Sequence, residues 1–316
     1  MTKIAVIDLG SNTTKLLIGR LLPDQLIETN FQKSIPCRIA TTLNGNQDSI
    51  LSTPEIERIV DVVQELLDDA VSNVSDQIFL VGTEALRKAE NITLLQSKIQ
   101  SETGLNLVVL SGKEEATAIA HGLSTDPNIR QLKDFYAFDL GGGSLELIKF
   151  SQSGLHSFHS LPLGSITLCN KFIKNPHAPL QAKEARNLRI FIADEIRKKF
   201  DSEINCKALV GCGGSLVHAR MLFPGRNKAI LPRSYFEELS SRVCSLNYEE
   251  RRIQYKELPA DRLDIIPTAL QTILEIFDIM GVSQLTHSFH NLRYGIISLS
   301  RLSSKGENLK TILRNG

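Results

Sequence analysis

The 316-residue chain lacks any long uninterrupted apolar stretch. A helix that crosses a membrane needs about 18 consecutive apolar residues, and no run in this sequence approaches that length. The chain also opens on an apolar segment, Lys3 to Asp8, with no basic region before it, so we expect no secretory leader. These absences predict a protein without a membrane partner.

Cysteines are few and carry no metal or redox spacing. The five of them form no CxxC pair, and their odd number means that they cannot all be paired; they are Cys37, Cys169, Cys206, Cys212 and Cys244. Unpaired cysteines suit a reducing compartment. We therefore predict a cytoplasmic protein.

The chain also has no large excess of positive or negative charge, and its net charge is only +1. The balance conceals a basic block, since residues 171–233 carry 13 Lys or Arg against 5 Asp or Glu. Such a block can attract a polyanion. It can equally be the solvated face of an amphipathic helix, and the sequence leaves both interpretations open.

The length and the order of the apolar patterns predict an α/β protein of two domains. We place the boundary at Asp126-Pro127-Asn128, which gives domains at 1–125 and 126–316 and leaves open that the last helix packs back on the first domain. Thr53 and Pro54 predict a helix that begins there and runs to about Ala70. A long helix is expected over 261–280, interrupted at Pro267.

The most informative segment is Phe135 to Lys149, in which Asp139 and a Gly-rich turn separate two apolar runs. Three glycines, Gly141 to Gly143, allow close approach of a ligand to the backbone. The N–H groups of such a turn suit phosphate oxygens, and Asp139 at its mouth could hold Mg²⁺ directly or through water.

The same arrangement occurs a second time, 131 residues earlier, in Ile4 to Ile18. Asp8 aligns with Asp139, and Gly10 aligns with Gly141. Two copies predict two related domains that each offer a phosphate loop to a shared cleft. A third Gly-rich turn, Gly211 to Ser215, fits either an anion or the close packing of a helix on a strand.

Several ordered motifs together resemble one known family. They are Asp8-Leu-Gly-Ser-Asn12, Gly82-Thr-Glu-Ala-Leu-Arg87, Ser111-Gly-Lys-Glu-Glu115, Asp139-Leu-Gly-Gly-Gly-Ser144, Leu161-Pro-Leu-Gly-Ser165, Gly211-Cys-Gly-Gly-Ser215 and Arg262-Leu-Asp-Ile-Ile266. This set resembles the exopolyphosphatase / guanosine pentaphosphate phosphohydrolase family of the actin-like ATPase superfamily. The resemblance implies two ribonuclease-H-like domains, each a mixed sheet flanked by helices, with an interdomain cleft.

The resemblance also implies Mg²⁺-dependent hydrolysis of a terminal phosphate, with roles for particular residues. Glu115 matches the catalytic glutamate that activates water, and Arg87 matches an arginine near the substrate phosphates. The implied metal site comprises Asp8, Asp139 and Glu146. The implied phosphate-binding residues are Gly10, Ser11, Asn12, Thr13, Gly141, Gly142, Gly143, Ser144, Gly213 and Gly214.

The same residues also have structural interpretations. Glu114 and Glu115 could simply complement the dipole at a helix start, where Ser111 and Glu114 form a capping-box pattern. Arg87 could pair with Glu84 on its own helix. His156, His159, His287 and His290 are predicted to be exposed and not to bind metal.

Two departures from the family pattern are visible. The chain contains no His-Asp dipeptide, so the C-terminal helical phosphohydrolase domain of longer members is expected to be absent. Near the C-terminus, Asn291-Leu-Arg-Tyr-Gly295 replaces the commoner Gly-Leu-Arg-Glu-Gly.

Four functional hypotheses follow. The first is an exopolyphosphatase acting on inorganic polyphosphate, and the second is a guanosine pentaphosphate phosphohydrolase. The third is an ATP-dependent kinase of the same superfamily, and the fourth is a non-catalytic sensor of polyphosphate or nucleotide. None involves DNA, and the resemblance allows a homodimer.

Overall fold

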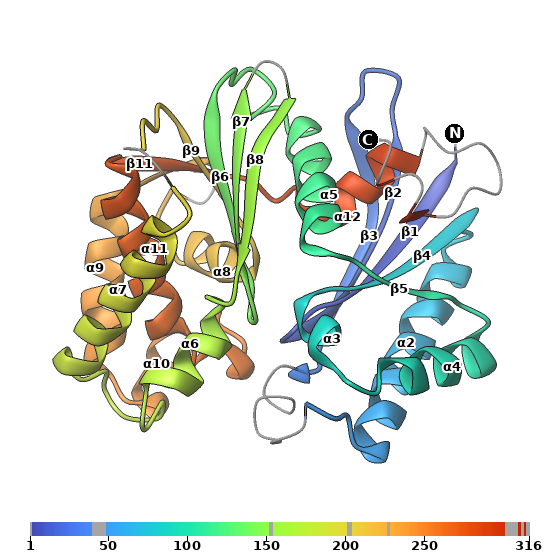
Figure 1. Cartoon of the computed structure of the whole chain (residues 1–316), viewed down its shortest axis with the longest axis horizontal. Helices are drawn as coiled ribbons and strands as arrows, with labels where there is room; N and C mark the ends of the chain where they lie inside the picture. Colours follow the sequence, from blue (N-terminus) through green and yellow to red (C-terminus); the bar gives the residue numbers. More distant parts are fainter. Residues whose placement is uncertain are drawn as a thin grey trace. The chain divides into compact units, whose positions relative to one another are not determined.

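The structure is a computed structural model of the chain, and it describes residues 2–39, 49–151, 154–200, 204–225, 228–300, 309, 310 and 313. The chain divides into two compact units (Figure 1). The first comprises Met1–Arg130 and His290–Gly316, as far as these ranges are described, and the second is Gln131–Phe289. The predicted domain ranges, 1–125 and 126–316, stay a prediction.

The first unit contains a mixed five-stranded sheet in the order β3-β2-β1-β4-β5. Three strands form an antiparallel meander, β1 (Lys3–Leu9), β2 (Thr13–Leu21) and β3 (Ile27–Pro36). Two further strands run parallel to β1, namely β4 (Gln77–Gly82) and β5 (Leu107–Val109). Four consecutive residues of β1, Ile4 to Ile7, are buried, so helices must cover both faces of the sheet.

The helices of the first unit are α2 (Thr53–Ser72), α3 (Glu84–Lys88), α4 (Ile92–Thr103), α5 (Gly112–Ser124) and α12 (Leu292–Leu299). Thr53 was expected to be the N-cap of α2, but the structure shows that the N-cap is Ser52, one residue earlier. Its backbone N–H donates to the Glu55 carboxylate at 2.7 Å. Helix α12 packs on α5 and on strands β1 to β3, so the C-terminal helix completes the first unit.

Two glycines bring α5 and α12 into backbone contact. A Cβ atom built on Gly295 would lie 1.6 Å from the Ala118 carbonyl oxygen, and one on Gly122 would lie 2.2 Å from that of Asn291. No side chain fits at either position. This close crossing fixes the helix that carries Glu114 and Glu115.

The second unit contains a mixed six-stranded sheet in the order β10-β11-β9-β6-β7-β8. An antiparallel meander is formed by β6 (Phe135–Leu140), β7 (Leu145–Ser151) and β8 (Gly154–Leu161). Strand β9 (Leu209–Cys212) is parallel to β6, and β11 (Gln284–His287) is parallel to β9. The short edge strand β10 (Ile230–Pro232) was not predicted.

The second unit's described helices are α6 (Ser165–Phe172), α7 (Ala182–Arg197), α8 (Gly214–Met221), α9 (Arg233–Ser245), α10 (Tyr248–Gln254), the 3₁₀ turn η1 (Ala260–Arg262) and α11 (Ile266–Met280). The predicted helix over 261–280, interrupted at Pro267, was right from Ile266 onward and wrong about the interruption. Pro267 lies in the first turn of α11, where its missing N–H needs no partner, so proline begins this helix and does not interrupt it. Helix α11 packs on α7 and α9 in the core.

The predicted duplication is confirmed by the topology of the two sheets. Strands β1, β2, β3, β4 and β5 correspond in order and direction to β6, β7, β8, β9 and β11. In Figure 1 the two meanders are blue and green. Of the helices described, none combines the length and the apolarity that a membrane crossing requires.

Candidate functional site

The first Gly-rich turn connects β1 to β2 and is held by the segment after β3. The backbone N–H groups of Cys37 and Arg38 both donate to the Asn12 carbonyl, at 2.9 and 2.8 Å. A Cβ on Gly10 would lie 2.9 Å from the Thr13 carbonyl oxygen, so glycine is required for this tight turn. Ser11, Asn12 and Thr13, predicted to bind phosphate, are buried in it.

Asp8 stands at the end of β1, opposite Lys15 on β2. Its Oδ1 atom is enclosed and accepts no hydrogen bond from the described residues. Burial raises the pKa of Asp8, while the positive charges of Lys15 and Arg293 act to lower it. A buried carboxylate oxygen without a hydrogen bond fits a site that is completed by a bound cation or a protonated ligand.

Arg293 is a residue of interest that sequence reasoning missed. It lies in α12, is buried, and donates from Nη1 to the Leu16 carbonyl oxygen at 3.3 Å. The segment Asn291 to Gly295 had been noted only as a departure from the family pattern. Its position 285 residues after Asp8 gives no local sign that its charge acts on that carboxylate.

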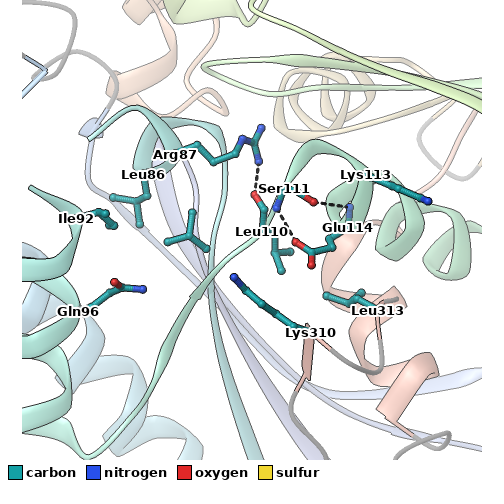
Figure 2. Close-up of a pocket in the computed structure, with 11 residues that line it drawn as sticks. Leu86, Arg87, Ile92, Gln96, Leu110, Ser111, Lys113, Glu114, Lys310 and Leu313 are labelled. Carbon is teal, nitrogen blue, oxygen red and sulfur yellow. Dashed lines mark hydrogen bonds between the residues drawn. The ribbon is translucent and has the colours of Figure 1, made fainter. Parts of the chain in front are cut away.

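Glu115 and Arg87 lie together in the first unit. Arg87 Nη1 donates to Glu115 Oε2 at 2.6 Å and to the Leu110 carbonyl oxygen at 2.8 Å. Figure 2 shows the guanidinium group directed at Leu110. Glu115 is only 6% exposed, whereas the Arg87 side chain is 23% exposed, so the contact is a charge-assisted hydrogen bond at the edge of the protein interior.

The structure separates the functional and structural interpretations of the neighbouring residues. Glu114 forms the capping box, since its Oε2 accepts from the Ser111 N–H at 2.8 Å and its own N–H donates to Ser111 Oγ at 3.3 Å. Glu84 pairs with Lys88, one turn along α3, and not with Arg87. Cap formation therefore accounts for Glu114 and leaves Glu115 for another role.

The second Gly-rich turn, in the second unit, is clamped by the start of α6. The N–H groups of Ser165 and Ile166 donate to the carbonyls of Gly141 and Gly142, at 3.0 and 2.8 Å. Thr167 Oγ1 donates to the Gly143 carbonyl at 3.0 Å. These carbonyls are thereby occupied, and the turn is rigid before any ligand arrives.

Gly164 makes this clamp sterically feasible. A Cβ there would lie 2.3 Å from the carbonyl carbon of Gly143 and 2.4 Å from that of Gly142. Gly164 and Ser165 belong to the Leu161-Pro-Leu-Gly-Ser165 motif, to which the sequence assigned no role. The structure shows that the motif positions the Gly141–Gly143 turn.

Asp139 and Glu146 occupy directly opposed positions on β6 and β7. Opposed residues of an antiparallel pair share a face, with Cβ atoms about 5 Å apart. Glu146 is buried and its Oε1 accepts from Ser160 Oγ at 2.9 Å. The matching position in the first unit pairs Asp8 with Lys15, so only the second copy places two acids side by side.

The third Gly-rich turn closes on Asp139. Gly213 has a φ of +98°, and a Cβ there would lie 2.4 Å from Asp139 Oδ1. Gly211 is explained by packing, since a Cβ would lie 2.5 Å from Leu216 Cδ1. The packing interpretation is therefore supported at Gly211, whereas anion binding by Gly213 and Gly214 stays a prediction.

A magnesium ion was predicted at Asp8, Asp139 and Glu146. Among the described residues, no group of three His, Cys, Asp or Glu side chains is gathered as a metal site. Mg²⁺ usually takes one or two carboxylates together with substrate phosphates and water. The opposed Asp139 and Glu146 supply that number, and the enclosed Asp8 oxygen also fits a cation.

The histidines were predicted to be exposed, and this was wrong for His287. It is fully buried in β11, where Arg220 Nη1 lies 2.9 Å from its Nδ1 and Phe289 packs edge-on against its ring. In β11 alternate residues are buried, and His287 lies on the same buried face as Leu285. The prediction was also wrong for His159, which is half-buried against Phe200, and for His290, which is half-buried and stacks on Tyr294. His156 is exposed as predicted.

Comparison with known proteins identifies the family. The model of the Ppx/GppA phosphatase family matches residues 24–304. The chain belongs to the Ppx/GppA phosphatase family. This membership confirms the resemblance inferred from the motifs.

Two relatives of this Ppx/GppA family member are guanosine-5'-triphosphate,3'-diphosphate pyrophosphatases. The protein from Aeromonas hydrophila is 26% identical over 298 residues, which cover 93% of the chain and 58% of the relative. The protein from Aeromonas salmonicida is 27% identical over 301 residues, with the same coverage. The chain therefore spans less than two thirds of the length of these curated relatives.

Solved structures confirm the fold. The Aquifex aeolicus member of the Ppx/GppA family superposes with a TM-score of 0.81 at 20% identity, covering 97% of this chain and 99% of that one. An exopolyphosphatase from Cytophaga hutchinsonii gives a TM-score of 0.84 at 20% identity, covering 98% and 99%. The predicted α/β class with two mixed sheets flanked by helices is confirmed.

Proposed function

We propose that the chain is an exopolyphosphatase that hydrolyses the terminal phosphate of inorganic polyphosphate. The observation that carries this proposal is the pairing of the buried Glu115 with the half-buried Arg87, which stands apart from the capping role of the adjacent Glu114. Family membership and the two clamped Gly-rich turns support it.

In the proposed reaction, Glu115 accepts a proton from the attacking water. Arg87 presents its guanidinium to phosphate oxygens and neutralises charge that develops on the transferred group. The turns at Gly10 to Thr13 and Gly141 to Ser144, with Gly213 and Gly214, bind phosphate through backbone N–H groups.

Magnesium, when bound, would neutralise phosphate charge and help to orient the attacking water. Asp139 and Glu146 would hold it in the second unit, and the enclosed Asp8 oxygen is a separate cation candidate in the first. The carboxylates thus keep a negative site ready on β6 and β7, while Arg87 and the turns fix the phosphates.

Guanosine pentaphosphate is the second candidate substrate, because the two Aeromonas relatives are named for that activity. The chemistry at the terminal phosphate would be the same. We place the reaction in the cytoplasm, in keeping with five free thiols, and a homodimer stays a prediction.

The test compares Mg²⁺-dependent phosphate release from polyphosphate of defined lengths, guanosine pentaphosphate and ATP. We expect release from polyphosphate and a loss of about 10³-fold in Glu115→Gln, as for removal of a general base. Glu114→Gln is the matched control and should retain turnover. Preference for guanosine pentaphosphate would support the second candidate, ADP formation with phosphate transfer to an acceptor would support the kinase, and binding without turnover would support the sensor.

A further inference from the structure

The first unit contains a cavity of about 840 Å³ beside Arg87 (Figure 2). Its lining comes from α3, α4, β5, the start of α5 and the C-terminal segment. The described lining residues are Leu86, Arg87, Ile92, Gln96, Val109, Leu110, Ser111, Lys113, Glu114, Lys310 and Leu313. The volume lies in the range of small-molecule sites, and Arg87 is the one described lining residue to which a catalytic or phosphate-binding role is given above.

The lining combines apolar walls with polar groups on several sides. Figure 2 shows Gln96 and Lys310 extending toward each other from opposite sides, while Ser111 and Arg87 lie on another. The described lining contains three cationic side chains, Arg87, Lys113 and Lys310, against the acid Glu114, and Glu115 offsets the charge of Arg87. The remaining excess of one positive charge favours an anion. A fatty acid needs one polar end and a long apolar tunnel, so this distribution fits a nucleotide better.

The base and the phosphate of a nucleoside monophosphate each find suitable side chains in the cavity lining. The aliphatic side chains Leu86, Ile92 and Leu110 can cover the faces of a base. Gln96 is oriented by its Nε2 donating to the Leu107 carbonyl at 3.0 Å, which holds its amide ready for a polar base edge. Lys310 provides the charge for a phosphate.

The cavity also has a direct physical connection to Glu115. Arg87 and Leu110 both line it, and Arg87 Nη1 donates at once to the Leu110 carbonyl and to Glu115. A ligand that moves Leu110 or the Arg87 side chain must alter the contact with Glu115.

We propose that this cavity is a regulatory site for a purine nucleoside monophosphate, whose binding changes turnover through the Arg87–Glu115 contact. The coupling rests on the proposed function of Glu115, whereas the binding does not.

Calorimetric titration with GMP and AMP tests the binding, because neither contains a phosphoanhydride bond that the proposed reaction could cleave. We expect at least one of them to bind wild type, and Ile92→Trp and Lys310→Glu each to weaken binding by about tenfold or more. Leu94→Trp is the matched control, since Leu94 lies on the same helix but is 55% exposed and outside the lining. Circular dichroism checks that each variant is folded.

Absence of binding by both nucleotides, or equal binding by wild type and Lys310→Glu, would overturn the site. The Lys310→Glu titration decides the matter if Ile92→Trp does not fold. The coupling is tested separately by phosphate release from polyphosphate with and without the bound nucleotide. A nucleotide that binds without changing the rate would overturn the coupling, and an enzyme without polyphosphatase activity would still leave the binding measurable.

Discussion

At the scale of single residues, two adjacent glutamates differ because of the helix on which they stand. Glu114 is three residues after the N-cap Ser111, where a carboxylate folds back onto the backbone. Glu115 is one residue further, so its side chain leaves the cap and meets Arg87 from α3. A rotation of about 100° along the helix is enough to separate a structural acid from a candidate catalytic one.

Arg87→Ala should lower kcat by about 10²–10³-fold, as expected when a donor to developing charge is removed. Unfolding should become easier by about 1–3 kcal/mol, because the buried Glu115 loses its partner. Arg87→Lys should show losses of kcat and of stability that lie between those of wild type and Arg87→Ala, since lysine keeps the charge and lacks the planar fork. Turnover assays and urea titrations measure both effects. Full activity in Arg87→Lys would show that the fork is not needed.

Asp8 should show a conflict between stability and activity. Burial raises its pKa above 3.8, so folding penalises the ionised form. The stability contributed by the protonated form is complete below pH 3.8 and is lost as pH rises through the folded pKa. Asp8→Asn should therefore have a higher Tm than wild type at pH 7 in chelator, with the gain shrinking toward pH 3.8, while turnover falls about 100-fold. A Tm difference independent of pH would contradict this.

At the scale of elements, the Gly141–Gly143 turn depends on a helix that supplies no proposed ligand. Helix α6 uses the N–H groups of its first turn, which have no partner inside the helix, to hold the carbonyls of Gly141 and Gly142. The loop is therefore shaped by backbone contacts that any change in its distance from α6 would break.

Gly164→Ala should separate α6 from the loop, because the new methyl group would lie 2.3 Å from the Gly143 carbonyl carbon. We expect a loss of about 2–3 kcal/mol in stability and at least tenfold in turnover. Ser165→Ala is the control, since it removes only a 3.2 Å hydrogen bond to Gly141, at a cost of about 1 kcal/mol. Equal effects of the two substitutions would refute the steric argument.

The elements also show what sequence could and could not provide. Alternating apolar runs around Asp8 and Asp139 predicted both hairpins, because strand periodicity and Gly-rich turns are local. Pro267 was misjudged because proline suits a helix start as well as a break, and only the surrounding packing decides. Arg293 and Gly164 were missed because their roles depend on contacts with residues distant in sequence.

At the scale of the whole molecule, the two related units differ in how they are composed along the sequence. The second unit is continuous in sequence, whereas the first is built from both ends of the chain. All eight residues of α12 are buried, and they pack on α5 and the first sheet. The first unit therefore lacks a large part of its core without them.

A fragment of residues 131–289 should fold cooperatively alone, while residues 1–130 should not, because α12 is missing from the latter. Thermal unfolding followed by circular dichroism distinguishes the two. Adding a peptide of residues 290–316 to the 1–130 fragment should restore a cooperative unfolding transition. Cooperative unfolding of residues 1–130 at the temperature of the intact protein would contradict the role given to α12.

The bond from Arg293 to the Leu16 carbonyl spans 277 residues, and this has a consequence for biosynthesis. Strands β1 and β2 leave the ribosome before the second unit is made, whereas α12, which packs on them, is made only after it. During that interval the continuous second unit can mature, while the exposed apolar face of the first sheet is open to chaperones. A change of translation speed over the codons for residues 131–289 should then affect the yield of active protein more than the same change after residue 290.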